Sequence, residues 1–446
     1  MKNIGVLYVL FLFLLCGCSD WLTVMPKTQM PADDMFKNEE GFQDALMGCY
    51  IKLADVYRAE GDHVSDFIEH IACQWDGFSK ESMEGKLNVH EYFDADGDIT
   101  RMFQNLYKSV ADVNIVLEYI DNGVLQEAMY NELKGQLLAL RAFLHFELIR
   151  LWGPIPTEMG SKKYLPYALK IQVKPYEYSS YDKYMSLLTA DLDEAERLLM
   201  LHNNSTTTST LHPEFLKYYG LLALRSRVAL WMNDKEAACK YARMVCESGY
   251  FMLGTVADVN SGAYSFPTEH IFTLAQETKR TNFLVSYYVY EEILRSSLFA
   301  DDPSDVRLSL WMQQEGSDED DVVKMNCIKF NLIKEEGTEN EDLSLVVPII
   351  RLAELYLILI ECSDIDTANR LYEEFCLARR CTYTPLDLMN RQSIVMMEYQ
   401  KEFVGEGQLF YYYKRLGIKN MPRCSRACGT ASYVLPLPRK EIDITY

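Results

Sequence analysis

The sequence lacks the short motifs that mark the common enzyme classes. No GxSxG, HExxH, phosphate-binding loop or GxGxxG dinucleotide motif occurs in its 446 residues. Basic residues are also scarce, with 44 Lys and Arg against 65 Asp and Glu, and a net charge of −21 repels phosphate backbones. We therefore expect a protein that is not an enzyme, needs no cofactor and binds no nucleic acid.

The twelve cysteines include no CxxC pair, and only seven histidines accompany them. Cysteine metal sites usually show such pairs, so the sequence predicts no metal site. Cys239 and Cys246 lie two helical turns apart, where free thiols are commonly buried. Cys424 and Cys428 lie in a loop-like segment and could form a disulfide in an oxidising compartment, a question that the sequence leaves open.

An apolar run long enough to span a bilayer, about 20 residues, is also absent. The nearest candidate is Ile4–Leu15, which is uncharged, follows a single lysine and leads to Leu15-Cys16-Gly17-Cys18. A short apolar core with a leucine three places before a cysteine predicts a lipoprotein signal peptide over residues 1–17. Cys18 would then carry lipid, and residues 18–38 would form the tether. An ordinary secretory signal is the alternative.

Helical periodicity dominates residues 39–250. Apolar residues recur at steps of three and four along residues 133–151, which predicts one apolar helix face, ended by Gly153 and Pro154. Residues 215–232 and 235–248 predict a helix pair of about 34 residues, the length of a tetratricopeptide-like unit. Further helices are expected near residues 39–59, 99–121 and 181–201, with irregular segments over 60–100 and 203–210.

The helical pattern weakens over residues 251–345, where short apolar stretches alternate with Gly, Asn and acidic clusters. We expect a loop-rich insertion with short strands there. Helical pattern returns over residues 346–446, in segments near 352–360, 368–380 and 387–404, followed by a tail from Gly405 that is mostly loop. The expected fold class is mainly α, with helix pairs flanking an irregular lobe.

Five short segments occur in order along nearly the whole chain. They are Cys18-Ser19-Asp20-Trp21-Leu22, Leu140-Arg141-Ala142-Phe143-Leu144-His145-Phe146 with the following Trp152-Gly153-Pro154, Lys329-Phe330 with Arg351-Leu352-Ala353-Glu354-Leu355, Glu402-Phe403-Val404-Gly405-Glu406, and Tyr433-Val434-Leu435-Pro436. Together they resemble the SusD/RagB family of outer-membrane nutrient-binding lipoproteins. Each segment alone is a weak signal, and their common order behind a lipoprotein signal makes the resemblance specific.

The resemblance implies tetratricopeptide-like helix pairs forming a scaffold, with the loop-rich residues 251–345 as a variable ligand face. It implies an oligosaccharide ligand, or a peptide in some members, and a TonB-dependent outer-membrane transporter as partner. The protein would be lipid-anchored in the outer membrane and would face the cell exterior. The chain is somewhat short for the family, which implies trimmed loops on the ligand face.

Sugar rings stack on aromatic side chains, while their hydroxyl groups need hydrogen-bonding partners. The candidate ligand-binding residues in the irregular regions are Trp75, Asp76, Tyr287, Tyr288, Tyr290 and Trp311. Burial in the core is the competing interpretation of each, and adjacent tyrosines in a strand point to opposite faces. Trp152 and Trp231 belong to predicted helices and are expected in the core.

Two other features have a structural and a functional interpretation. His145 could act as a general base, but a hydrogen-bonded core histidine is expected. The acidic run from Asp94 to Asp98 departs from the calcium-loop pattern, so a surface turn is expected there. Besides an oligosaccharide-binding lipoprotein, the sequence leaves two functions open: a peptide- or protein-binding scaffold of the same architecture, and, less favoured, a surface glycoside hydrolase.

Overall fold

The computed structural model describes residues 31–57, 64–205, 212–276, 287–300, 302–314, 322–330 and 345–444. The predicted signal peptide, Cys18 and the first part of the tether lie outside these residues. Within the described ranges, no helix has both the length and the apolar run needed to cross a membrane.

Helix α7 (Glu127–Trp152) is the central element of the helical scaffold. It ends at the residue before the Gly-Pro pair, as the sequence predicted. The prediction of one apolar face was too narrow, because nearly every side chain after Leu133 is buried, including those of Arg141, His145, Glu147 and Arg150. A helix surrounded on all sides buries its polar residues only where each finds a partner.

Two of these polar residues show how that requirement is met. Arg141 donates to the Asp191 carboxylate from Nε and Nη2, at 2.7 and 2.6 Å. His145 is fully buried, lies 2.8 Å from the Tyr184 hydroxyl through Nδ1, and stacks on Tyr167 with ring centroids 3.8 Å apart. Burial lowers the pKa of His145 to about 3, so the ring is neutral at physiological pH. The expectation of a core histidine is confirmed.

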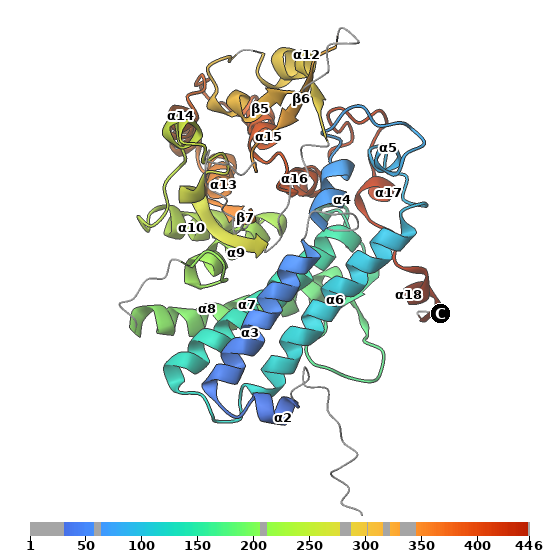
Figure 1. Ribbon diagram of the computed structural model, residues 1–446, viewed down its shortest axis with the longest axis vertical. Helices are drawn as coiled ribbons and strands as arrows, with labels where there is room; N and C mark the ends of the chain where they lie inside the picture. The colour runs from blue at the N-terminus through green and yellow to red at the C-terminus, as the bar shows by residue number, and fades with distance from the viewer. Residues whose placement is uncertain are drawn as a thin grey trace, which may run out of the picture.

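The helices pack as neighbouring pairs along the scaffold (Figure 1). Around α7 lie α3 (Glu39–Val56), α6 (Asp96–Tyr119) and α8 (Tyr181–Ser205); next come α9 (Tyr218–Trp231) with α10 (Lys235–Cys246), and α13 (Leu352–Cys362) with α14 (Ile365–Arg379). Small residues let α9 and α10 approach, since the Ser226 hydroxyl donates to the Ala238 carbonyl at 2.9 Å. The mainly α fold of tetratricopeptide-like helix pairs is therefore confirmed. Trp152 and Trp231 are buried in it, and Cys239 and Cys246 are free thiols on α10, as expected.

Short strands occur in the predicted insertion, as expected. Strand β3 (His270–Gln276) pairs antiparallel with β7 (Leu345–Arg351), and a three-stranded antiparallel sheet has the order β4 (Val289–Tyr290), β6 (Lys324–Cys327), β5 (Trp311–Gln313). This second sheet lies in the upper part of Figure 1, away from α3, α6 and α8. A separate hairpin joins β1 (Lys163–Pro166) to β2 (Tyr178–Ser180). The smaller elements nearby are α11 (Val256–Asn260), α12 (Glu291–Ile293) and the 3-10 helix η6 (Val306–Leu310).

Three segments expected to be irregular contain helix. Residues 60–100 include α4 (Val64–Ile71) and α5 (Met83–Leu87), α8 continues through residues 203–205, and the tail includes α16 (Gln408–Leu416), α17 (Thr430–Tyr433) and α18 (Arg439–Ile444), after α15 (Arg391–Glu402). Helix α4 is short, and the glycines around it obscured the apolar face formed by Phe67, Ile68 and Ile71. Helix α16 contains four successive aromatic residues with modest helix propensity, and burial of their side chains overrides that propensity. The run from Asp94 to Asp98 is a turn only at its first two residues, because α6 begins at Asp96, where acidic residues favour a helix N-terminus; Asp94 forms an ion pair with Lys86.

Candidate functional site

The six predicted ligand residues come together where the segment after α4 meets the three-stranded sheet. Trp75 and Asp76 follow α4, whereas Tyr288 and Tyr290 lie at β4 and Trp311 begins β5. The two segments are joined through their backbones, since the Asp76 N–H donates to the Tyr288 carbonyl at 2.9 Å. We call the resulting cluster the aromatic patch; its rings are Trp75, Phe78, Tyr287, Tyr288, Tyr290 and Trp311.

The two tryptophans form the buried layer of the aromatic patch. Trp75 is 1% exposed and Trp311 7%, and their ring centroids lie 5.9 Å apart. Trp75 also packs against Tyr287, with centroids 5.6 Å apart. These two side chains offer almost no surface to a ligand, which favours the competing interpretation of burial in the core. Ligand contact by them stays a prediction. Their packing instead joins the segment after α4 to strand β5.

The tyrosines divide between the two faces of their strand. Tyr287 turns inward, where its hydroxyl donates to Asp66 at 2.6 Å and lies 3.1 Å from Nε2 of His70. Tyr288 and Tyr290 lie together instead, with ring centroids 5.4 Å apart and a tilt of 66°. Both are half-buried, so part of each ring is available to solvent. The expected alternation of adjacent tyrosines is confirmed.

A glycine lets Tyr288 lie close to the main chain. Gly77 has a φ of +82°, which disfavours other residues, and a Cβ placed there would lie 1.7 Å from the Tyr288 hydroxyl. The Nζ of Lys324, on the neighbouring strand, lies 5.1 Å from the centroid of the Tyr288 ring. The orientation of Tyr288 is thus fixed from two sides.

Polar groups border the half-buried rings. Asp76 accepts the Tyr290 N–H at 3.0 Å through Oδ2 and pairs with Arg423 at 2.6 Å through Oδ1. The side chains of Asp76 and Arg423 are 17% and 19% exposed, so both retain an accessible edge. Arg423 also donates to the Gln74 carbonyl, which joins the C-terminal tail to the patch. Asp76 therefore has a structural role, and ligand contact by it stays a prediction.

Sequence reasoning missed Phe78, Lys324 and Arg423 as members of this site. Phe78 was within reach, since it follows the Trp-Asp pair in the same irregular segment. Lys324 and Arg423 are brought in by strand pairing and by the tail, and no local pattern marks either contact.

Helix α4 carries two acidic side chains next to the patch, and burial raises the pKa of both. Burial raises the pKa of Asp66 to about 6, although the hydrogen bond from Tyr287 opposes the shift. Burial likewise raises the pKa of Glu69 to about 7, against hydrogen bonds from the Gly405 and Gly407 N–H groups at 3.0 and 2.8 Å. These contacts fasten α4 to the loop before α16.

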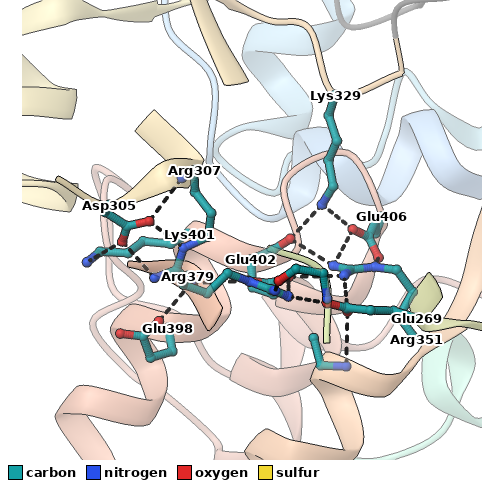
Figure 2. Close-up of polar contacts among 12 residues, drawn as sticks. Glu269, Asp305, Arg307, Lys329, Arg351, Arg379, Glu398, Lys401, Glu402 and Glu406 are labelled. Atoms are coloured by element: carbon teal, nitrogen blue, oxygen red, sulfur yellow. Dashed lines mark hydrogen bonds and ion pairs between the residues drawn. The ribbon is translucent and has the colours of Figure 1, made fainter. Parts of the chain in front are cut away.

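An ion network ties the segments that carry the patch to the C-terminal helices (Figure 2). Its five basic members are Arg307, Lys329, Arg351, Arg379 and Lys401, and its five acidic members are Glu269, Asp305, Glu398, Glu402 and Glu406. Formal charges balance, which is the condition under which ions tolerate burial. Arg307 lies four residues before Trp311, and Lys329 follows the central strand β6. The network therefore anchors the three-stranded sheet that carries part of the patch.

A second concave surface lies between the start of α9 and the start of β3. It encloses about 200 Å³ and is bordered by Phe215, Lys217, Tyr219, Tyr250, Phe251 and His270. Beside Trp311 the cavity is only about 20 Å³, so the deeper hollow is away from the aromatic patch. A sugar that stacks on a ring needs an open face rather than a deep cavity, and on this ground we favour the patch.

Comparison with known proteins supports the same family over different parts of the chain. A SusD-like family model, described as starch-binding and associating with the outer membrane, matches residues 20–224. The SusD-like protein P38 of Formosa agariphila is 24% identical over 257 residues, 57% of this chain and 47% of that protein. The chain thus spans about half the length of this curated relative.

Solved structures extend the likeness to nearly the whole fold. A SusD superfamily protein from Bacteroides thetaiotaomicron has a TM-score of 0.73 at 21% identity, covering 91% of this chain and 98% of its own. A laminarin-binding SusD-like protein has a TM-score of 0.70 at 16% identity, covering 91% and 97%. The chain is therefore similar to the SusD-like family model over residues 20–224, and it shares its fold with a SusD superfamily structure over 91% of its length.

Proposed function

We propose that the protein binds an oligosaccharide at the aromatic patch and passes it, without catalysis, to a TonB-dependent transporter. The observation that carries the ligand proposal is the arrangement of Tyr288 and Tyr290, two half-buried rings whose centroids lie 5.4 Å apart on the strand face opposite Tyr287. Asp76, Lys324 and Arg423 lie within the same cluster as partners for sugar hydroxyl groups. A relative of the same fold is a laminarin-binding protein, which supports a glucan as the first ligand to test.

Replacing Tyr288 and Tyr290 together by alanine is expected to weaken binding of the best ligand in a glycan panel by at least about tenfold, or 1.4 kcal/mol. Aromatic anchors at the centre of a binding surface commonly contribute this much or more. Isothermal titration calorimetry with laminarin and starch oligosaccharides, on purified protein, measures the change. The protein should not hydrolyse these oligosaccharides, so no shorter sugars should be detected after the titration.

Tyr250→Ala is the matched control, because Tyr250 is 49% exposed and borders the other concave surface. It should leave glycan affinity unchanged. If the double variant keeps its affinity and Tyr250→Ala loses it, the ligand binds at the second surface instead. That surface is also the feature that favours a peptide as the alternative ligand, since its aromatic side chains surround an enclosed space suited to a hydrophobic side chain.

The membrane part of the proposal depends on Cys18, which lies outside the described residues. We expect lipidation of its thiol to hold the protein in the outer membrane, facing outward, beside the transporter. Cys18→Ala should move the protein from the membrane to the soluble fraction while leaving its circular dichroism spectrum unchanged. Detergent extracts of the unaltered protein should contain the transporter after affinity purification. A variant that stays with the membrane would contradict the anchor.

A further inference from the structure

Four side chains from opposite ends of the sequence converge beside the aromatic patch. Cys73 follows α4, His90 follows α5, and Cys424 and Cys428 lie between α16 and α17. His90 and Cys424 are separated by 334 residues, yet Nδ1 of the ring lies 3.8 Å from the Cys424 sulfur. Three of the four side chains are buried and that of Cys424 is half-buried.

The hydrogen bonding of His90 leaves one ring nitrogen directed at the sulfurs. Nε2 lies 2.9 Å from the Ile71 carbonyl oxygen, and because a carbonyl only accepts, the proton is assigned to Nε2. Nδ1 therefore presents its lone pair, 3.8 Å from the Cys424 sulfur and 3.9 Å from that of Cys428. A backbone carbonyl that holds the far nitrogen in this way is the usual support of a metal-bound histidine.

The distances among His90 Nδ1 and the sulfurs of Cys424 and Cys428 match three corners of a tetrahedral site. The sulfurs of Cys424 and Cys428 lie 3.9 Å apart. Four ligands around zinc, with Zn–S bonds of about 2.3 Å, place neighbouring sulfurs about 3.8 Å apart. The third sulfur, that of Cys73, lies nearby: one ligand atom from each of Cys73, His90 and Cys424 lies within 4.8 Å of the others.

A disulfide accounts for this arrangement less well. It would join two of the three sulfurs at about 2.05 Å and leave a third thiol beside an imidazole lone pair. The backbone also favours a fixed set of ligands. Cys73, His90 and Arg423 have φ values of 58°, 57° and 64°, three of the six non-glycine residues with positive φ in the described part of the chain. Such a conformation is unfavourable for a residue other than glycine and persists where the surrounding contacts enforce it.

We propose that Cys73, His90, Cys424 and Cys428 bind one Zn²⁺ ion in a closed Cys3His site. Binding converts the three thiols to thiolates and releases their protons to solvent, so affinity falls at low pH. With four protein ligands the ion has no open position and acts as a structural clip. The sequence predicted no metal site because the four ligands come from three segments that only the fold brings together.

The proposed clip lies against the aromatic patch. Cys73 immediately precedes Gln74, Trp75 and Asp76, and Cys424 follows Arg423, which contacts Gln74 and Asp76. The ion would thus hold the C-terminal tail against the segment after α4. This inference does not depend on the identity of any ligand at the patch.

Metal analysis of the full mature chain, purified under reducing conditions and dialysed after incubation with Zn²⁺, tests the proposal. We expect about one Zn²⁺ per chain, and Co²⁺ in its place should give the visible absorption of a tetrahedral thiolate site. Cys424→Ser should weaken Zn²⁺ binding more than about 100-fold, measured in competition with a chromophoric chelator. Changing a residue that only hydrogen-bonds to a metal ligand costs about 10–100-fold, and loss of a ligand itself should cost more. Zn²⁺ should raise the melting temperature of the unaltered protein but not that of Cys424→Ser.

Cys362→Ser is the control, since its half-buried thiol lies on α13 and outside the cluster. It should retain one Zn²⁺. Cys428→Ser provides a second ligand variant if Cys424→Ser fails to fold. Two results would overturn the proposal. The first is a Cys424–Cys428 or Cys73–Cys424 disulfide in protein purified without reductant, if that protein still binds no Zn²⁺ after reduction. The second is a fully reduced protein that stays metal-free after incubation with Zn²⁺.

Discussion

Glu402→Gln is expected to lower the free energy of unfolding by about 3–5 kcal/mol at neutral pH, the usual cost of breaking a buried ion pair from one side. The Glu402 carboxylate is buried and accepts hydrogen bonds from Arg379 at 2.7 Å, Arg351 at 3.0 Å and Arg307 at 3.2 Å. The amide carries no charge and points two N–H groups toward these guanidinium groups. Three arginines would then share an uncompensated positive charge.

The pH dependence of the loss identifies its cause. Burial alone raises the pKa of Glu402, but the guanidinium groups of Arg379 and Arg351 outweigh it and hold the pKa well below 4.5. A carboxyl group with a depressed pKa in the folded state contributes stability above its unfolded pKa and loses it as the pH falls. The difference between the unaltered protein and the variant should therefore narrow below about pH 4.5.

Urea unfolding followed by tryptophan fluorescence, at neutral and at acidic pH, measures both effects. Glu373→Gln makes the same chemical change on the exposed face of α14 and should alter stability by no more than about 0.5 kcal/mol. If Glu402→Gln costs no more than this control, the ion network does not hold the lobe to the helices.

Trp75→Ala should destabilise the protein by about 3–5 kcal/mol, because it removes a 1% exposed ring from the base of the aromatic patch. Trp311 and Tyr287 lose their packing partner, and the sheet that carries Tyr288 loses its support. Ligand affinity should fall along with stability. Tyr288→Ala, by contrast, should cost roughly 1 kcal/mol of stability or less, since the ring is half-buried, and should still weaken binding.

Thermal unfolding and calorimetric titration on the same samples separate these effects. Trp75→Phe keeps an aromatic ring at the position and should recover most of the stability and affinity. A Trp75→Ala variant with normal stability but no ligand binding would show that Trp75 contacts the ligand directly. In that case the two-layer description of the patch would be wrong.

Regular periodicity made most of the scaffold predictable. The long run of leucines fixed α7, and the short turn between residues 232 and 235 indicated the α9–α10 pair. Helices α4 and α16 could not be found in this way. Helix α4 spans only two turns, and α16 owes its form to the burial of successive aromatic side chains, an effect of tertiary packing that no local pattern records.

The candidate site was predictable in part, for a similar reason. Aromatic residues in irregular segments could be picked out, and all six predicted side chains meet in one cluster. Their division into a buried and an accessible layer depends on strand pairing, which places Tyr287 and Tyr288 on opposite faces. Arg423 and His90 depend on contacts across more than 300 residues of sequence. Such contacts leave no signal in a single sequence.

The segments that suggested the family have their own physical explanation. Lys329, Arg351, Glu402 and Glu406 each come from one of those segments, and all four belong to the ion network. Two of the five segments therefore contain residues of the ion network, and none of the candidate ligand residues lies in any of the five. This explains why the sequence indicated the family readily and the ligand hardly at all.

The residues that hold the three-stranded sheet in place are different from the residues of the aromatic patch. The ten side chains of the network fix where the sheet sits, and none of them is among the rings of the aromatic patch. The outward rings at positions 288 and 290 can therefore be exchanged without loosening the attachment. On the proposed function, we expect that redesign of these two half-buried positions changes ligand specificity while the ion network stays unaltered.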